Sequence, residues 1–228
     1  MPAKNTIKQY SEDGIFHVYN RGINKGNIFL DELDYKMFLH FLKLYLTDPT
    51  LLGSDPNKAQ SRVVRKNFDG VIDLLCYCLM PNHFHLVLKQ NTANGITEFM
   101  RCIITNYVMY FNKQHDRMGP LFQGKLKAVL VDEDSYLIHL SKYVHANPTK
   151  LFAKTDLGDV NLADYDYSSY AEYIGIRNAK WVKPQFILSV FANSDGIGQK
   201  DMARYKEFVK HYQEEKEKLF LGDLILED

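Results

Sequence analysis

The chain has 228 residues, of which 46% are hydrophobic and 25% charged, a balance typical of a folded globular protein that excludes wholesale disorder. No stretch approaches the roughly 20 apolar residues of a membrane helix, and the polar N-terminus lacks a signal core. Three cysteines cannot form a disulfide framework. We therefore expect a soluble, cytoplasmic protein with no membrane partner.

The charge is divided between two parts of the chain, although the net charge is zero. Residues 1–152 hold 18 Lys+Arg and 14 Asp+Glu, whereas residues 153–228 hold 10 and 14. Seven of the eight histidines also lie in the first part. A basic part permits nucleic-acid binding but does not prove it. We expect residues 1–152 to form the domain that carries the chemistry, with residues 153–228 as an attached helical extension.

The first elements alternate between strand and helix. Residues 15–21 read as a strand that ends at Gly22. Residues 31–46 read as a helix with Asp31 as its N-cap. Its apolar residues recur at helical spacing: Leu33, Met37, Phe38, Phe41, Leu42 and Tyr45. The following loop, residues 47–67, is long and basic, which is typical of a functional or a disordered segment.

Two strands, a helix, a strand and a further helix follow: residues 71–79, 83–89, 96–112, 125–131 and 134–146. The sequence Met80-Pro81-Asn82 favours a tight turn, so the strands at residues 71–79 and 83–89 form an antiparallel hairpin. The order β-α-β-β-α-β-α predicts an α+β fold, a ferredoxin-like antiparallel sheet with helices on one face. The other face would be open to a site. The extension adds helical stretches at residues 162–173, 186–191 and 202–220.

The sharpest chemical feature is His83-Phe84-His85 on a predicted strand. Side chains alternate between faces along a strand, so the two imidazoles share one face. Neighbouring neutral imidazoles are suitable ligands for a divalent metal. The alternative is two ordinary histidines on a sheet surface.

The cysteines offer a competing site. If Pro81 and Asn82 are the central turn residues, Cys78 lies across from His85, and Cys76 shares that face. Two cysteines and two histidines would make a structural zinc site. We favour burial of both thiols, because free cysteines are commonly buried and residues 71–79 are apolar on both faces.

The last helix of the first part carries a polar stripe. His139, Tyr143 and Asn147 follow one another at i, i+4 and i+8. This helix follows the last strand and could lie across the open face, which would bring Tyr143 to the histidine pair. The simpler interpretation is that Tyr143 packs in the core and that Asn147 caps the helix ahead of Pro148.

Five sequence blocks carry a family resemblance: His-Val-Tyr-Asn-Arg-Gly at 17–22, Leu-Met-Pro-Asn-His-Phe-His at 79–85, Gly-Pro-Leu-Phe-Gln-Gly-Lys-Leu-Lys at 119–127, Tyr-Val-His-Ala-Asn-Pro at 143–148 and Tyr-Asp-Tyr-Ser-Ser-Tyr at 165–170. With these blocks in this order, the chain resembles the single-tyrosine HUH transposases, most closely the REP-associated tyrosine transposases. The likeness spans about residues 15–174. Tyr167 stands where tryptophan is often found, which we interpret as a change in packing.

The resemblance implies a chemistry and a partner. Family members act on single-stranded DNA, often beside a hairpin, as monomers or homodimers. It implies that His83, His85 and Asn147 hold Mg²⁺ or Mn²⁺ at the scissile phosphate and that Tyr143 is the nucleophile. The product is a 5′-phosphotyrosine link. The activator of the Tyr143 hydroxyl stays open between the metal, His139 and a water.

Candidate DNA contacts lie in the matching blocks and on the basic loop: Arg21, Arg62, Arg65, Lys66, Lys125 and Lys127. Each could equally be a solvated surface charge. Two alternatives to a metal-dependent nickase and strand transferase remain. One is a DNA-hairpin-binding protein without catalysis, and the other is the zinc module of Cys76, Cys78, His83 and His85.

Overall fold

The computed structural model describes residues 12–51, 66–152, 161–193, 197–222 and 225. Its centre is a four-stranded sheet in the order β2-β3-β1-β4. The strands are β1 (Ile15–Arg21), β2 (Ile72–Met80), β3 (His83–Gln90) and β4 (Lys127–Val131). Every pair is antiparallel. This confirms the predicted ferredoxin-like sheet. Residues 52–65 of the basic loop predicted at residues 47–67 lie outside the described residues.

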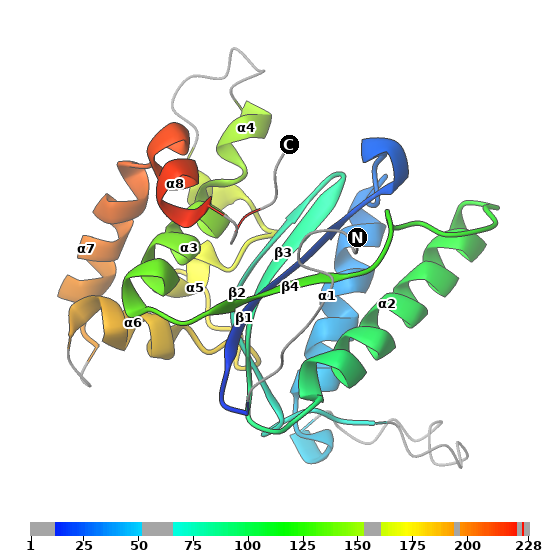
Figure 1. The fold of residues 1–228 in the computed structure, drawn as a ribbon, viewed down its shortest axis with the longest axis horizontal. Coiled ribbons are helices and arrows are strands. Elements are labelled where there is room, and N and C mark those ends of the chain that lie inside the picture. The colour runs from blue at the N-terminus through cyan, green and yellow to red at the C-terminus, as the bar shows by residue number, and fades with distance from the viewer. Residues whose placement is uncertain (1–11, 52–65, 153–160, 194–196, 223–224, 226–228) are drawn as a thin grey trace.

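Helices α1 (Glu32–Leu46) and α2 (Gly95–Gln114) lie against one face of the sheet (Figure 1). Phe16 and Val18 of β1 and Phe84 of β3 point to that face and are almost fully buried. Asp31 caps α1 as predicted, since its side chain accepts from the backbone N–H of Asp34. The alternation of apolar residues along β1 and β3 thus supplies the first core and leaves the histidines for the other face.

The opposite face is covered, which differs from the open surface expected (Figure 1). Its cover consists of α3 (Asp134–Ala146) and the helices of residues 153–228: α5 (Tyr170–Tyr173), α6 (Pro184–Ala192), α7 (Gln199–Lys210) and α8 (Glu214–Leu221). The short segments are α4 (Thr149–Phe152), η1 (Ile23–Lys25), η2 (Pro49–Leu51) and η4 (Leu162–Asp164). None of the helices in the described part of the chain is long and apolar enough to span a membrane.

The extension also closes the free edge of β2. Leu79 donates its backbone N–H to Tyr167 O at 2.9 Å, and Lys183 donates to Leu74 O at 2.8 Å. Tyr167 stacks on Tyr35 of α1 with 3.9 Å between ring centroids, so the residue that departs from the family pattern does pack against the core. An uncovered sheet edge is a template for unwanted pairing, and these segments satisfy it.

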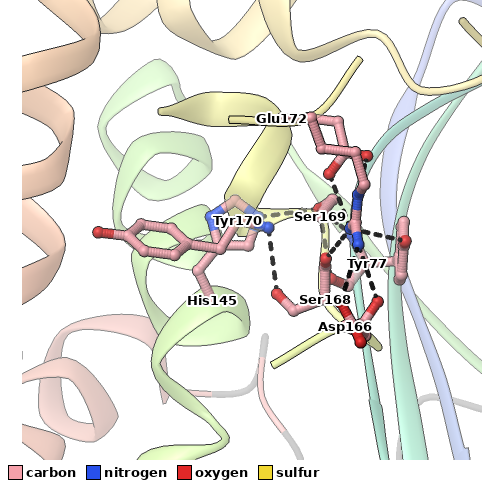
Figure 2. Close-up of polar contacts among 8 residues, drawn as sticks. Tyr77, His145, Asp166, Ser168, Ser169, Tyr170 and Glu172 are labelled. Atoms are coloured by element: carbon pink, nitrogen blue, oxygen red, sulfur yellow. Dashed lines mark hydrogen bonds and ion pairs between the residues drawn. The ribbon is translucent and has the colours of Figure 1, made fainter. Parts of the chain in front are cut away.

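A buried polar network fastens the extension to the sheet and to α3 (Figure 2). Tyr77 of β2 donates its backbone N–H to Ser169 Oγ at 2.8 Å, and Ser169 Oγ lies 2.9 Å from His145 Nε2. His145 Nδ1 lies 2.9 Å from Tyr205 OH, and Tyr205 donates to Ser141. A neutral His145 that donates from Nδ1 and accepts at Nε2 satisfies both partners.

A salt bridge adds to this junction. Arg177 Nε lies 2.6 Å from Glu172 Oε1, and its guanidinium also donates to the backbone oxygen of Ser168. Glu172 is only 4% exposed, whereas the Arg177 side chain is 33% exposed. Removing Arg177 would leave the buried Glu172 charge without its partner, which would destabilise the junction.

We predict that His145 makes the folded state sensitive to acid. Burial lowers the pKa of His145 to about 3, whereas an unfolded histidine titrates near 6.5. Below pH 6.5 only the unfolded state takes up this proton, so stability falls as the pH falls towards 3. From pH 7 to pH 5 the loss is about 2 kcal/mol.

Urea unfolding at both pH values tests this. His145→Gln should lose about 2 kcal/mol less than wild type between pH 7 and pH 5, and the exposed His211→Gln should behave like wild type. Equal pH dependence of wild type and His145→Gln would contradict the prediction.

Candidate active site

The histidine pair lies on β3, on the face that points away from α1 and α2. His85 pairs with Tyr19 of β1 and with Cys78 of β2, and His83 pairs with Arg21 and Met80. The two rings stand edge to face with centroids 4.9 Å apart. His83 is 8% exposed and His85 is fully buried. The two imidazoles therefore share one face as predicted, but beneath a cover and not on an open surface.

A third histidine, His17 of β1, completes the cluster. Its Nε2 lies 2.9 Å from His85 Nδ1, and the two rings stack at 5.1 Å. His17 is fully buried. Sequence reasoning did not assign His17 to the site. Two signals were available: His17 begins the sequence block at residues 17–22, and the alternation of side chains along β1 puts it on the same face as Arg21. The contact joins two strands and fixes the plane of the His85 ring.

The His85 imidazole is held neutral. Burial is the main cause that keeps its pKa well below the ordinary value, and the nearby His83, His17 and Lys150 lower it further. A neutral imidazole keeps a nitrogen lone pair, which is the form that binds metals. Lys150 is therefore close enough to act on His85, and sequence reasoning missed this basic side chain. Its Nζ lies 3.0 Å from Glu214 Oε1 of α8.

Helix α3 delivers Tyr143 to the histidines. The helix follows β4 directly and crosses the second face of the sheet (Figure 1). The Tyr143 ring stands edge to face against His85, with 5.4 Å between centroids, and is 1% exposed. Tyr143 belongs to the same buried cluster as Leu140 and Val144, so it is both a packing residue and a neighbour of the metal-ligand candidates.

Asn147 serves as the helix cap and also retains an unused oxygen. Its Nδ2 donates to the backbone oxygen of Tyr143 at 2.9 Å, the capping role that the sequence allowed. Its Oδ1 is buried and has no hydrogen-bond partner. The cap fixes the amide orientation, so the two interpretations of Asn147 are compatible.

The unsatisfied atoms decide whether a metal fits these residues. His85 Nε2 and Asn147 Oδ1 are two of the four buried side-chain atoms without a partner among the described residues. An unsatisfied buried polar atom costs about 1–3 kcal/mol, so each of these two atoms is a candidate for binding a ligand. Imidazole nitrogen and amide oxygen suit a divalent cation such as Mn²⁺, and His83 stands beside His85. The residues therefore fit Mg²⁺ or Mn²⁺.

The zinc module receives no support. The register confirms that Cys78 lies opposite His85, but both thiols are buried, and burial raises their pKa. Cys78 Sγ contacts Met80 Sδ at 3.8 Å. The one group of three or more His, Cys, Asp or Glu at metal-binding spacing in the described ranges is Asp31, Asp34 and His115, on the far face.

His139 does not reach the site. Its Nδ1 lies 2.8 Å from Glu217 Oε2 of α8, and Glu217 also pairs with Lys142 at 3.0 Å. The stripe of His139, Tyr143 and Asn147 therefore divides. Its first member contacts α8, Tyr143 contacts His85, and Asn147 caps the helix. This removes His139 as the base for Tyr143.

One candidate DNA contact, Arg21, stands next to the histidines. It is directly opposite His83, and its Nε donates to Gln123 Oε1 at 3.0 Å. Gln123 in turn donates its backbone N–H to Arg21 O at 2.8 Å. Two of the sequence blocks thus form one corner that orients a guanidinium. Gln123 is a further residue that sequence reasoning missed.

The other candidates are dispersed. Lys127 lies 5.6 Å above the Tyr19 ring, close to the same corner, and Lys125 is exposed beside it. Lys66 pairs with Glu98 on the surface at 2.9 Å. Arg62 and Arg65 lie outside the described residues. Of these candidates, Arg21 therefore lies on β1, the strand next to the histidine pair, and Lys127 lies over the Tyr19 ring of that strand.

Comparisons with known proteins indicate which family this chain resembles. Residues 55–147, which include His83, His85 and Tyr143, match the family model described as IS200-like transposase. The predicted resemblance to tyrosine transposases is confirmed. A search of curated proteins finds no match.

Two solved structures of transposases are also similar to this chain. A REP-associated tyrosine transposase bound to a REP hairpin has a TM-score of 0.50 and 14% identity, covering 78% of this chain and 90% of that chain. A putative transposase from Deinococcus radiodurans R1 gives 0.36 and 14%, covering 61% and 94%. The first of these shares the α+β architecture.

We predict that Asn147 contributes to metal affinity in the absence of DNA. Asn147→Ala removes the unused oxygen and should weaken Mn²⁺ binding by about ten-fold or more. Calorimetric titration of Mn²⁺ into wild type and variant measures this, with the exposed Asn178→Ala as control. Identical titrations of wild type and Asn147→Ala would reduce Asn147 to a helix cap.

Proposed function

We propose that the protein is a metal-dependent single-stranded DNA endonuclease and strand transferase, a transposase that forms a 5′-phosphotyrosine intermediate at hairpin-associated sites. The observation that carries this is the contact of Tyr143 with His85, whose Nε2 is buried without a hydrogen-bond partner. A phenol that can act as a nucleophile and two imidazoles that can bind a metal, those of His83 and His85, thereby meet. They do so in a chain that matches IS200-like transposases.

The chemistry is an exchange of one phosphoester for another. The Tyr143 oxygen bonds to phosphorus, the bond from phosphorus to the 3′ oxygen breaks, and the phenolic proton ends on solvent or on the leaving oxygen. Because the ester energy is retained, a second 3′-hydroxyl can reverse the step and join a new strand without ATP. One tyrosine and no energy source therefore suffice for transfer.

The cation that we propose at His83, His85 and Asn147 would polarise the scissile phosphate and offset charge in the transition state. The chain itself supplies position. Helix α3 holds Tyr143 against the sheet, and the cap from Asn147 to Tyr143 O secures that turn. A phenol has a pKa of about 10, so it needs activation at neutral pH. With His139 bound to Glu217, the cation or a water is the activator.

We further propose that Tyr143 acts in cis. The tyrosine and the histidine that it contacts belong to the same chain, so one copy contains a complete set. Tyr143 and His85 are both almost inaccessible to solvent, so DNA binding must displace side chains that cover them.

The partner that we propose is single-stranded DNA beside a hairpin. The REP-associated transposase of similar fold is bound to a REP hairpin, which supports this choice. Arg21 lies opposite His83 and Lys127 lies over the Tyr19 ring, which supports our proposal that Arg21, Lys125 and Lys127 contact phosphates. Such contacts release counterions, so binding should weaken steeply with salt.

The decisive prediction concerns covalent chemistry. Labelled single-stranded hairpin DNA, taken from sequence flanking the gene, is mixed with protein and Mn²⁺ and separated on a denaturing gel. Wild type should give a slow protein–DNA band, and Tyr143→Phe should give none while still binding DNA. Tyr136→Phe, a half-buried residue on the same helix, is the matched control.

Two controls give the gel its meaning. His85→Ala should also lose the band, because it removes a metal ligand. Measurable binding by wild type with no band from any flanking hairpin would favour the alternative of a binder without catalysis.

A second prediction concerns Arg21. Arg21→Ala should weaken DNA binding for all sequences and reduce the slope of log affinity against log salt by about 0.7, the value for one single-strand phosphate contact. Fluorescence anisotropy at several salt concentrations measures the slope. Arg101→Ala, on the exposed side of α2, should leave it unchanged. An unchanged slope for Arg21→Ala would return Arg21 to a structural role.

A further inference from the structure

The contact of His17 with His85 links two rings that are both fully buried. His17 lies on β1, a central strand that pairs with β3 on one side and with β4 on the other. It is opposite Val87 and Val129, so its backbone position is fixed from both sides. The His17 ring also lies against Tyr19 at 4.7 Å. A ring held this firmly can orient another one.

The 2.9 Å separation between His17 Nε2 and His85 Nδ1 requires one nitrogen to donate and the other to accept. If His85 accepts, its own proton sits on Nε2, a buried nitrogen without a partner. A buried N–H without an acceptor is rare and costly. If His85 donates from Nδ1, its Nε2 carries only a lone pair. The second arrangement leaves no orphaned proton.

We propose that His17 is a positioning residue that locks His85 in the Nδ1–H tautomer. The Nε2 lone pair then stays available to bind a divalent cation. This deepens the proposed function and rests on its assignment of His85 as a ligand. Metal-ligating histidines in general donate a hydrogen bond from the N–H of their other ring nitrogen to an acceptor. Here the acceptor is a second imidazole, that of His17.

His17 thereby differs from the histidines of the pair. It acts through His85 and touches neither the cation nor the DNA in this assignment. The role needs only an acceptor at the position of His17 Nε2. Glutamine places its side-chain oxygen near that position, whereas phenylalanine fills the space without an acceptor.

The first experiment reads the tautomer directly. Long-range ¹H–¹⁵N NMR of the metal-free, DNA-free full chain should show His85 protonated on Nδ1. Calorimetric Mn²⁺ titrations then compare wild type, His17→Gln and His17→Phe. We expect His17→Phe to bind Mn²⁺ about ten- to one hundred-fold more weakly and His17→Gln to stay close to wild type.

A matched control separates orientation from general loss of packing. Gln90→Leu replaces a fully buried polar side chain at the other end of β3, away from His85, and should keep wild-type Mn²⁺ affinity. Thermal unfolding of each variant confirms that the titrated protein is folded. If His17→Phe does not fold, His17→Leu at lower temperature and the wild-type tautomer serve in its place.

The outcomes distinguish this proposal from the reaction itself. An Nε2–H tautomer of His85 in wild type, or equal Mn²⁺ affinity with and without an acceptor at residue 17, overturns the role of His17. No Mn²⁺ binding by wild type overturns both the metal site and this role. A locked tautomer with graded affinities, but no covalent protein–DNA band, supports His17 and overturns only the proposed reaction.

Discussion

The pairing of β1 with β3 is the constraint on which the rest of the site depends. It places His17 diagonally across from His85 and Arg21 directly across from His83. Because side chains alternate along a strand, the same pairing sends Phe16, Val18 and Phe84 to α1 and α2. A slip of one residue would exchange the two sets and bury the apolar side chains against Tyr143. The register of one strand pair therefore sets both core and chemistry.

The second face of the sheet combines burial with polarity. Tyr143, His85 and Asn147 are almost without solvent contact, yet His85 Nε2 and Asn147 Oδ1 have no partner in the described ranges. A core selected only for stability would hold apolar residues in their place or would satisfy these atoms. By contrast, His145 on the same helix has both nitrogens engaged. His145 is therefore a buried histidine with all its hydrogen bonds made, whereas His85 keeps one nitrogen unsatisfied.

Local patterns predicted much of this fold. The strand at residues 15–21 and the helix at residues 134–146 agree with β1 and α3, because periodicity, Gly22 and Pro148 mark their ends. The turn at Pro81 and Asn82 predicted the register of Cys78 with His85. Helical periodicity placed Leu33 in the core, but it is 47% exposed, whereas Asp34 is buried. The carboxylate of Asp34 accepts from Leu30 N and also contacts His115, which is 81 residues away and which no local pattern reveals.

Long-range contacts account for what the sequence did not reveal in the site. His17 and Gln123 become interpretable only when β1 meets β3 and the segment before β4. His139 was assigned by helical spacing to the stripe of Tyr143, but Glu217, 78 residues away, binds it. The sequence predicts the extension only as an attached helical segment. Its apolar residues share one core with apolar residues of β2, β3 and α3, which come earlier in the chain.

That shared core has a consequence for any attempt to shorten the protein. Tyr143 and Val87 lie in one cluster with Leu188, Tyr205 and Leu221 of the extension. A chain cut after α3 would expose this apolar face together with the free edge of β2, and exposed apolar area and unpaired edges both favour aggregation. The helices after residue 152 are thus not an appendage to be trimmed for expression or replaced by a fusion partner. A minimal version of this protein, if one is engineered, would need a redesigned surface beneath them.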